Sequence, residues 1–181
     1  MPGNIYDAQT IREEWSGDEV AIRQVHQAAF PTSAESRLVD ELRRAGRLTI
    51  SLVAIADEQV VGHVAFSPVT LEGGDARALA CPLGLAPLAV LPPWQKLGVG
   101  SALVKAGLEQ CRRLSAGYVV VLGSPAYYGR FGFSPAANWN LSDDYQGGPA
   151  FQAIELVAGA IPPQGGRIRY APEFALFESE N

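Results

Sequence analysis

One stretch of the sequence restricts the possible folds more than any other, because it joins two strands and a helix through a turn with two glycines. Residues 83–91 are almost entirely apolar and end at Pro92 and Pro93, where a strand stops pairing. Residues 98–114 carry apolar side chains at helical spacing. Residues 118–122, YVVVL, are typical of a strand that is buried on both faces and paired in parallel. This crossover unit predicts a mixed α/β fold.

Two short helices are predicted before this unit, after a short first strand. Capping-box pairs mark both helix starts: Ser16 with Glu19, and Thr32 with Glu35. The first helix is expected to end at Phe30, because the proline that follows disfavours helix there. The second is expected to end at Gly46, since glycine commonly terminates a helix in the left-handed conformation.

Further strands are predicted on both sides of the crossover unit. Residues 48–56 and 60–71 are two β-rich runs joined by a polar turn, DEQ, which indicates an antiparallel hairpin. A polar loop follows at residues 72–79. Towards the C-terminus we expect a short helix in SPAYYGRFGF, a strand at 151–157 and a last, edge strand at 167–177.

Length and charge narrow the class of protein. With 181 residues the chain suits a single domain that spans residues 1–181. Its net charge of −5 disfavours a nucleic-acid partner bound through a general basic surface. No apolar run is long enough to span a bilayer, and the N-terminal MPGNIYDAQT lacks the basic flank and apolar centre of a signal peptide. We therefore expect a cytoplasmic protein with no membrane partner.

The two cysteines, Cys81 and Cys111, indicate neither a metal site nor a disulfide framework. Neither lies in a C-x-x-C pair or beside a cluster of histidines, so no zinc site is expected. Sparse cysteines fit free thiols in the cytoplasm. Cys111 falls on the apolar stripe of the helix at 98–114 and is expected in the core.

The turn before that helix has the physical features of an anion site. Gly98 and Gly100 let the backbone approach a ligand closely. The first N–H groups of a helix have no partner inside it, and the helix dipole adds about half a positive charge there. A pyrophosphate fits this description, whereas a Walker A loop needs Lys-Ser/Thr after the second glycine and a dinucleotide fingerprint needs a third glycine. A glycine-rich helix start without a ligand is the alternative.

Several segments together resemble one family. In this order, LAPLAVLPPWQKLGVGSALV, YVVVLG and YYGRFGF resemble the GNAT superfamily of acyl-CoA N-acetyltransferases, and VGHVAFSPV and DDYQGGPAFQAIEL resemble its YhbS-like bacterial branch. The resemblance implies a strongly twisted, mixed sheet of six or seven strands flanked by about four helices. It also implies acetyl-CoA as the co-substrate and no metal.

The resemblance assigns the contacts of the co-substrate residue by residue. The family's Q/R-x-x-G-x-G/A loop, which holds the CoA pyrophosphate, corresponds here to Gln95, Lys96, Leu97, Gly98, Val99 and Gly100, with Ser101 next. Arg130 is a candidate contact for a CoA phosphate, and its alternative is an ordinary exposed arginine.

In the family the fourth strand, here residues 85–91, splays from the fifth and pairs with the pantetheine arm. Pro87 has no N–H to donate, so a bulge or an edge is independently expected beside it. Leu88, Ala89 and Val90 then face the co-substrate, and an N–H of this trio is the oxyanion candidate. A strand end that proline merely interrupts is the alternative.

The resemblance also selects Tyr128 as the catalytic residue. The family commonly places a tyrosine near the CoA sulfur, four residues before the glycine of a Gly-Phe pair, here Gly132 and Phe133. Tyr127 is the second choice. Proton transfer from a phenol of pKa near 10 to a thiolate near 8.5 is uphill by about 2 kcal/mol, so we expect a hydrogen bond to the departing sulfur more than full protonation. The alternative is that both tyrosines are aromatic core.

No general base is evident, because the strand at 85–91 carries no acidic residue. His26 and His63 titrate in the useful range, but a structural role is favoured for each. Glu35 lies at a helix start beside the expected acceptor groove, which the loop at 30–33 and C-terminal loops form, and its alternative is the capping role. An acidic loop either attracts a cationic amine or is an ordinary solvated surface, the favoured interpretation; its residues are Asp143, Asp144 and Tyr145.

We therefore predict transfer of the acetyl group of acetyl-CoA to a primary amine by direct attack, since no Cys or Ser stands in a nucleophile context. The acceptor, a small molecule or a peptide, is not encoded in any short motif. The oligomeric state is equally hidden, and a homodimer stays open. The alternative from another class is a non-catalytic regulatory or interaction domain that binds CoA.

Overall fold

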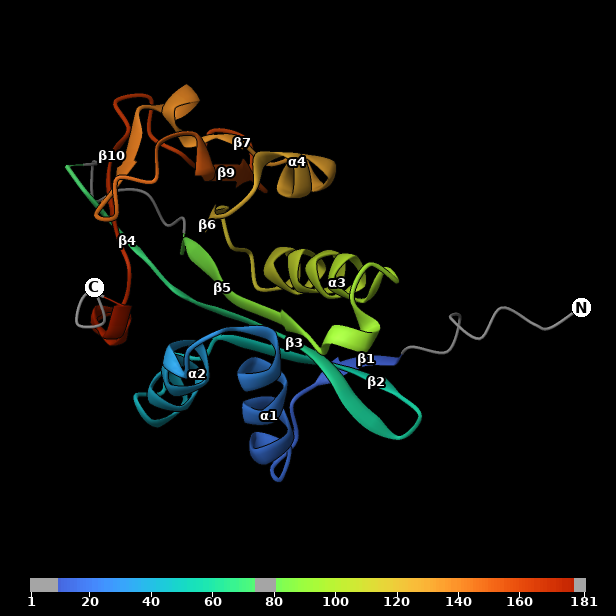
Figure 1. The fold of residues 1–181 in the computed structure, drawn as a ribbon. Coiled ribbons are helices and arrows are strands. Elements are labelled where there is room, and N and C mark those ends of the chain that lie inside the picture. The colour runs from blue at the N-terminus through green and yellow to red at the C-terminus, as the bar shows by residue number, and fades with distance from the viewer. Residues whose placement is uncertain (1–9, 74–80, 178–181) are drawn as a thin grey trace, which may run out of the picture.

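The chain folds around a twisted seven-stranded sheet, and a smaller three-stranded sheet lies at one end of it (Figure 1). The computed structural model describes residues 10–73 and 81–177, so most of the polar loop expected at 72–79 lies outside the described residues. In spatial order the strands of the large sheet are β1 (Thr10–Glu13), β2 (Ile50–Ala56), β3 (Gln59–Pro68), β5 (Leu83–Val90), β6 (Tyr118–Leu122), β9 (Phe151–Glu155) and β7 (Ser134–Pro135).

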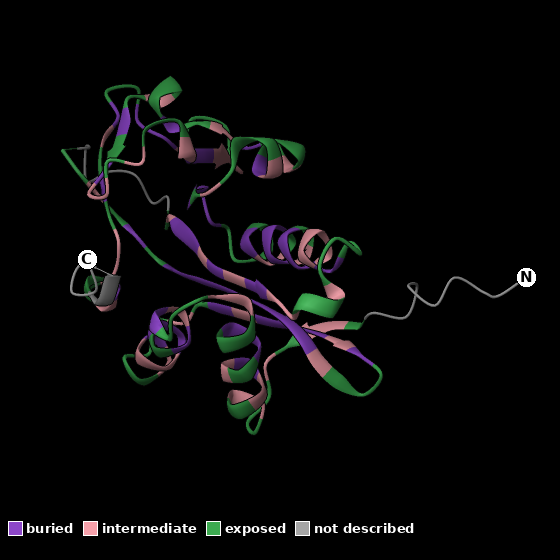
Figure 2. Ribbon diagram, viewed as in Figure 1, coloured by how far each residue is buried: buried purple, intermediate pink, exposed green. Residues whose placement is uncertain are grey.

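Two helices cover one face of the large sheet and a third covers the other face (Figure 1). The first face carries α1 (Glu19–Ala29) and α2 (Ala34–Arg44), the second carries α3 (Val99–Arg113), and a short α4 (Pro125–Tyr128) follows β6. Buried residues run along the central strands and the inner sides of these helices (Figure 2). Cys111 of α3 is fully buried, as predicted. A seven-stranded mixed sheet with four α-helices, over the described residues, confirms the predicted fold class.

The two N-terminal helices lie where the sequence predicted them, but the capping boxes do not form. α1 begins after Asp18 and α2 after Ser33, and neither of these side chains caps its helix. Asp18 instead forms an ion pair with Arg12 at 2.6 Å. The predicted pairs of Ser16 with Glu19 and of Thr32 with Glu35 are therefore wrong. Glu19 accepts from the N–H of Gly17, and Thr32 Oγ1 accepts from the N–H of Ala34.

Strands β2 and β3 form the predicted antiparallel hairpin. Asp57 and Glu58 at its turn have φ angles of 48° and 61°, as a two-residue type I′ turn requires. The turn is one residue shorter than predicted, because Gln59 already pairs with Ala56.

Strand β5 pairs along its whole length with one neighbour and only briefly with the other. Its antiparallel ladder with β3 extends from Leu83 to Val90. Its parallel pairing with β6 is confined to Leu83 with Val119 and Gly84 with Val120. The two strands diverge after these pairs, and we call this divergence the β5–β6 fork.

A bulge decides which face each side chain of β5 takes. Ala86 and Pro87 of β5 stand opposite the single residue Ala65 of β3, which is the bulge that the proline predicted. As a result Ala86 packs with α2, whereas Leu88 and Val90 pack with the core beneath α3.

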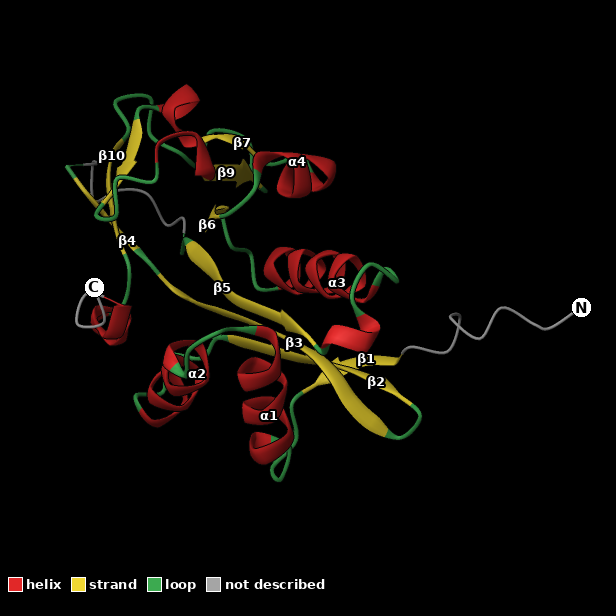
Figure 3. Cartoon of the chain, in the orientation of Figure 1, coloured by secondary structure: helices red, strands yellow, loops and turns green. Residues whose placement is uncertain are grey.

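The predicted C-terminal edge strand is wrong in both extent and place. β10 (Gly166–Arg169) is the central strand of the small sheet, between β4 (Thr70–Glu72) and β8 (Leu141–Asp143) (Figure 3). A 3₁₀ helix, Pro172–Phe177, follows and contacts α2. The sequence gives little sign of this arrangement, because the two neighbours of β10 come from distant parts of the chain.

Glycines allow α3 to lie close to strand β3. A Cβ atom on Gly107 of α3 would collide with the ring of Phe66, which is fully buried. A Cβ atom on Gly62 of β3 would lie only 3.0 Å from Leu103. This close contact sets the position of α3 and of the glycine turn at its start.

We predict that Gly107→Ala destabilises the fold by about 2 kcal/mol, because the added methyl would overlap the fully buried ring of Phe66. Urea unfolding followed by circular dichroism measures the change. Gly129→Ala is the matched control, since Gly129 has a helical φ of −55° and open space around its Cβ position. Equal stabilities of the two variants would contradict this account of the contact.

Candidate functional site

A cavity of about 610 Å³ opens between β5 and the start of α3, and we call it the α3 cavity. Its walls come from the end of β5, from the glycine turn with the first residues of α3, and from the segment after β6. It is lined by Leu88, Val90, Gln95, Lys96, Gly98, Gly100, Ser101, Tyr127 and Arg130. Most residues that the sequence assigned to the co-substrate therefore lie together around one space.

The glycine turn presents backbone donors to the α3 cavity. Gly98, the N-cap of α3, has a left-handed φ of 92° that favours glycine. The first helical hydrogen bond joins the N–H of Ala102 to the Gly98 carbonyl, so the N–H groups of residues 99–101 precede the ladder. A Cβ atom on Gly100 would lie 2.7 Å from the Tyr127 hydroxyl. The site thus has the helix dipole and the close backbone approach that an anion needs.

Tyr127 and Arg130 form one wall of the α3 cavity. A hydrogen bond joins the side chains of Tyr127 and Ser101, and burial raises the pKa of the Tyr127 phenol. The Arg130 guanidinium lies 4.5 Å from the centroid of the Tyr127 ring, and its Nε donates to the Tyr127 carbonyl at 3.1 Å. The sequence ranked Tyr127 only second, because in a Tyr-Tyr pair the pattern does not say which ring faces the cavity.

Three predicted contacts have side chains outside the lining of the α3 cavity. Ala89 and Val99 are 2% and 1% exposed, so their side chains are not available to a ligand. Leu97 is exposed at the surface. Gln95, in contrast, ties the turn to the strand, because its Nε2 donates to the Val90 carbonyl at 2.9 Å.

Tyr128 lies behind Tyr127, and its side chain is buried. Its ring makes edge contacts with Tyr127 at 5.0 Å and with Phe133 at 5.7 Å between centroids, and it covers Gly123 closely. Burial raises the pKa of the Tyr128 phenol above its usual range. A phenol in this state keeps its proton and serves as a hydrogen-bond donor rather than as an acid.

A chain of polar side chains runs through the core from α1 to the end of β1. His26 Nε2 lies 2.8 Å from His63 Nδ1, His63 Nε2 lies 2.8 Å from Ser51 Oγ, and Ser51 bonds to Glu14. A carboxylate only accepts, so Ser51 donates to Glu14 and the Nε2–H of His63 donates to Ser51. His63 then accepts at Nδ1 from the Nε2–H of His26.

Both histidines are neutral in the fold. Burial lowers the pKa of His26 to about 4 and lowers that of His63 well below its ordinary value. Both side chains have no exposed surface, and neither lines the α3 cavity. This arrangement agrees with the structural role that the sequence favoured for them.

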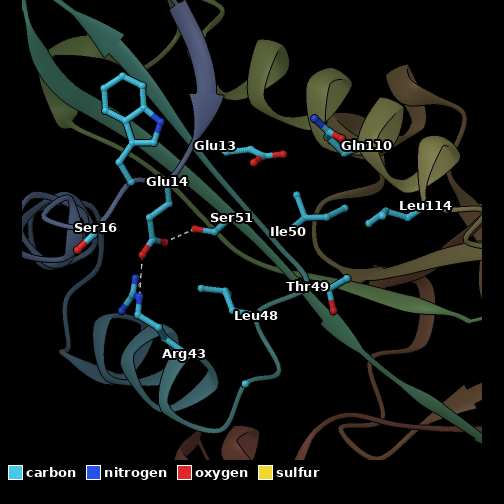
Figure 4. A pocket seen from close by; sticks show the side chains of 12 residues that line it. Glu13, Glu14, Ser16, Arg43, Leu48, Thr49, Ile50, Ser51, Gln110 and Leu114 are labelled. Atoms are coloured by element: carbon cyan, nitrogen blue, oxygen red, sulfur yellow. Dashed lines mark hydrogen bonds and ion pairs between the residues drawn. The ribbon is translucent and has the colours of Figure 1, made fainter.

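A second cavity, of about 420 Å³, lies at the far end of this polar chain (Figure 4). Glu14 stands between Ser51 and Arg43, whose Nε donates to the carboxylate at 2.7 Å. Both oxygens of Glu14 are therefore occupied within the fold. For this reason we take the α3 cavity, with its glycine turn, as the candidate functional site.

The remaining acidic candidates make contacts that stabilise the fold. Asp143 is 9% exposed and accepts two backbone N–H groups, and Asp144 pairs with two arginines of β10. These contacts favour the structural interpretation of the acidic loop. Glu35 differs, because one of its carboxylate oxygens is buried without a hydrogen-bond partner among the described residues.

Comparison with known proteins identifies the family. Residues 10–136 match the family model described as "Acetyltransferase (GNAT) domain". The chain is 39% identical over 169 residues to the N-acetyltransferase YhbS of Escherichia coli strain K12. The matched residues make up 92% of this chain and 99% of that protein. The chain therefore belongs to the GNAT family of acetyltransferases and is an N-acetyltransferase of that family.

Two solved structures of similar sequence share the fold. The crystal structure of YhbS from Escherichia coli in complex with CoA has a TM-score of 0.85 at 39% identity, over 92% of this chain and 91% of that one. A GNAT acetyltransferase from Brucella melitensis in complex with acetyl-CoA has a TM-score of 0.75 at 37% identity, over 92% and 97%.

Within residues 10–73 and 81–177 no three His, Cys, Asp or Glu side chains are grouped so that they could hold a metal ion. No helix in the same ranges has both the length and the apolar run that crossing a membrane requires.

We predict that acid weakens the fold through the buried histidines. Between pH 6.5 and 4 the unfolded chain takes up protons that His26 and His63 do not accept in the fold, so the free energy of unfolding falls as the pH falls. His63→Gln removes one of these groups. Denaturant unfolding at pH 7 and pH 5 should show a loss that is smaller by about 2 kcal/mol in the variant than in the wild type. Equal losses would contradict the assignment.

Proposed function

We propose that this chain transfers the acetyl group of acetyl-CoA to a primary amine by direct attack, without a covalent enzyme intermediate. The observation that carries the proposal is the start of α3, where Gly98 and Gly100 border the α3 cavity beside the β5–β6 fork. The relatives from Escherichia coli and Brucella melitensis were solved with CoA and with acetyl-CoA, which supports the same co-substrate here.

The residues around the α3 cavity suit the parts of CoA. The pyrophosphate takes the N–H groups of residues 99–101, where the helix dipole stabilises negative charge. Lys96 and Arg130 line the same cavity and supply positive charge to the phosphates. Leu88 and Val90 give an apolar wall for the pantetheine arm.

The fork makes main-chain groups of β5 available to the thioester. The ladder with β6 ends at Gly84, so an N–H of Leu88, Ala89 or Val90 polarises the thioester carbonyl. The amine nitrogen attacks the carbonyl carbon, the carbon–sulfur bond breaks, and the sulfur leaves as a thiolate. The nitrogen then loses one proton, which gives the amide.

Tyr128 donates a hydrogen bond to the departing sulfur in this proposal. Its raised pKa suits a group that stabilises the thiolate without giving up its proton. Tyr127 is the second candidate, because its side chain lines the α3 cavity. The proton of the attacking nitrogen leaves through water, since β5 carries no acidic residue and both histidines are buried.

The proposal assigns residues 1–181 to one N-acetyltransferase domain. The match to YhbS, which extends over 92% of this chain, supports this assignment. The protein acts in the cytoplasm, as the free thiols of Cys81 and Cys111 suggest. The rival hypothesis, a regulatory domain that binds CoA without consuming it, is not favoured by the relatives, which are named N-acetyltransferases.

We predict that acetyl-CoA raises the melting temperature of the wild type, because a ligand stabilises the state that it binds.

We predict that Gly100→Val weakens the binding of acetyl-CoA at least tenfold, since the valine side chain would enter the α3 cavity against the Tyr127 hydroxyl. Isothermal titration calorimetry measures the Kd. Gly129→Ala is the control and should bind as the wild type does. Unchanged binding by Gly100→Val would remove the glycine turn from the site.

We predict that Tyr128→Phe lowers kcat about tenfold or more and leaves the Kd of acetyl-CoA unchanged, because one hydrogen bond to the leaving group is lost. Amine-dependent release of CoA measures kcat. Tyr127→Phe keeps the same ring chemistry one position earlier and is the matched comparison. Full turnover by Tyr128→Phe would exclude Tyr128, and a loss confined to Tyr127→Phe would transfer the role to Tyr127.

A further inference from the structure

A third cavity, of about 180 Å³, borders the β5–β6 fork, and we call it the aromatic cavity. It is lined by Ala86, Leu122, Tyr145, Tyr170 and Phe174. Ala86 lies on β5, two residues before a residue that lines the α3 cavity, and Leu122 is the last residue of β6. Each arm of the fork therefore contributes a wall to the aromatic cavity.

The aromatic cavity and the α3 cavity open on opposite faces of the large sheet. Ala86 packs in a cluster with residues of α2 and with Phe174, whereas Leu88 packs against the core beneath α3. The bulge at Ala86 and Pro87 reverses the side-chain direction of β5 between these positions. Since the β5–β6 ladder ends at Gly84, the fork lies between the two cavities, at a place where no β5–β6 pairing closes the sheet.

Aromatic rings form most of the wall of this cavity. The centroids of Tyr145 and Tyr170 are 5.8 Å apart, and those of Tyr170 and Phe174 are 5.0 Å apart. The Tyr145 hydroxyl donates to the Phe174 carbonyl at 3.4 Å. The Tyr170 hydroxyl is buried and has no hydrogen-bond partner among the described residues. The cavity thus offers a ligand an almost wholly apolar surface.

Each carboxylate near the aromatic cavity has at least one partner among the described residues, although Oε2 of Glu173 is buried without a hydrogen bond. Asp143 accepts two backbone N–H groups, and Asp144 pairs with arginines of β10. Glu173, beside Phe174 in the chain, pairs with Arg47 at 3.1 Å. A ligand with several ammonium groups would have to bury its additional charges against this apolar wall, which is costly.

We propose that the aromatic cavity holds the apolar group of the acetyl acceptor, a small primary amine whose amino group is separated by one or two methylenes from an aromatic ring or a branched hydrocarbon. The inference rests on the proposed function and names its acceptor class. An apolar cavity of about 150 Å³ is large enough for benzene, so 180 Å³ accommodates a phenyl ring. The amino group then points out of the cavity towards the fork, where the thioester is attacked.

The test is amine-dependent release of CoA by the full chain, with the acetylated product verified by mass spectrometry. The amines are 2-phenylethylamine, ethanolamine, spermidine, an aminoglycoside and a lysine-containing peptide. We expect kcat/KM for 2-phenylethylamine to exceed every other value at least tenfold, because a fitted apolar pocket discriminates by about that much or more.

The outcomes separate this inference from the proposed function. A preference for ethanolamine, spermidine, the aminoglycoside or the peptide overturns the inference and leaves amine acetylation standing. No turnover of any amine, in a protein that acetyl-CoA stabilises against heat, overturns the inference and the proposed transfer together.

A wall substitution tests the place of binding. Leu122 is 36% exposed, so the fold tolerates Leu122→Ala, which widens the aromatic cavity. We expect kcat/KM for 2-phenylethylamine to fall about fivefold, the ratio of a naphthyl to a phenyl amine to rise, and the Kd of acetyl-CoA to stay unchanged. Leu114→Ala, at an exposed leucine after α3, should change none of these. An unchanged naphthyl-to-phenyl ratio in Leu122→Ala overturns the inference.

Discussion

The geometry of the molecule depends on the point at which β5 stops pairing with β6. β5 keeps its ladder with β3 to Val90, whereas its ladder with β6 ends at Gly84. Backbone N–H and C=O groups on such a free edge need other partners, since an unpaired buried group is costly. Pro87 removes one donor from this edge, and the bulge beside it turns Ala86 and Leu88 to opposite faces. The bulge and the end of the β6 ladder thus leave a cavity on each face of the sheet at this point.

The helix start is held over this irregularity by close packing elsewhere. Gly107 of α3 sits on the ring of Phe66, and Gly62 of β3 leaves room for Leu103. Because these contacts fix the axis of α3 against β3, the first turn of α3 must lie beside the end of β5. The side chain of Gln95 adds a direct tie, through its hydrogen bond to a β5 carbonyl. The packing of α3 against β3 therefore also sets the position of the glycine turn, and movement of α3 would move that turn.

The sequence predicted those features that depend on residues close together in the chain. The run at 118–122 is a strand with the predicted bounds, and the bulge beside Pro87 is present. The capping boxes failed because the N-cap positions fall at Asp18 and Ser33, and Asp18 pairs with Arg12 of another segment. β10 was misplaced for the same reason, since its two neighbours lie far away in the chain. The choice between Tyr127 and Tyr128 also depends on a tertiary contact, because only packing against Gly123 and Phe133 decides which ring is buried.

The two sides of the fork differ in how the chain builds them. The α3 cavity uses residues 88–101 and 127–130, which are short runs, so its chemistry leaves a recognisable motif. The aromatic cavity takes single residues from β5, β6, the acidic loop, the segment after β10 and the C-terminal 3₁₀ helix, so no motif records it. A substitution at Tyr170 or Phe174 alters one face and leaves the glycine turn on the other intact. With the acceptor in the aromatic cavity, as we propose, acceptor specificity can change independently of the helix start, and the sequence then reveals the acetyl donor and hides the acceptor.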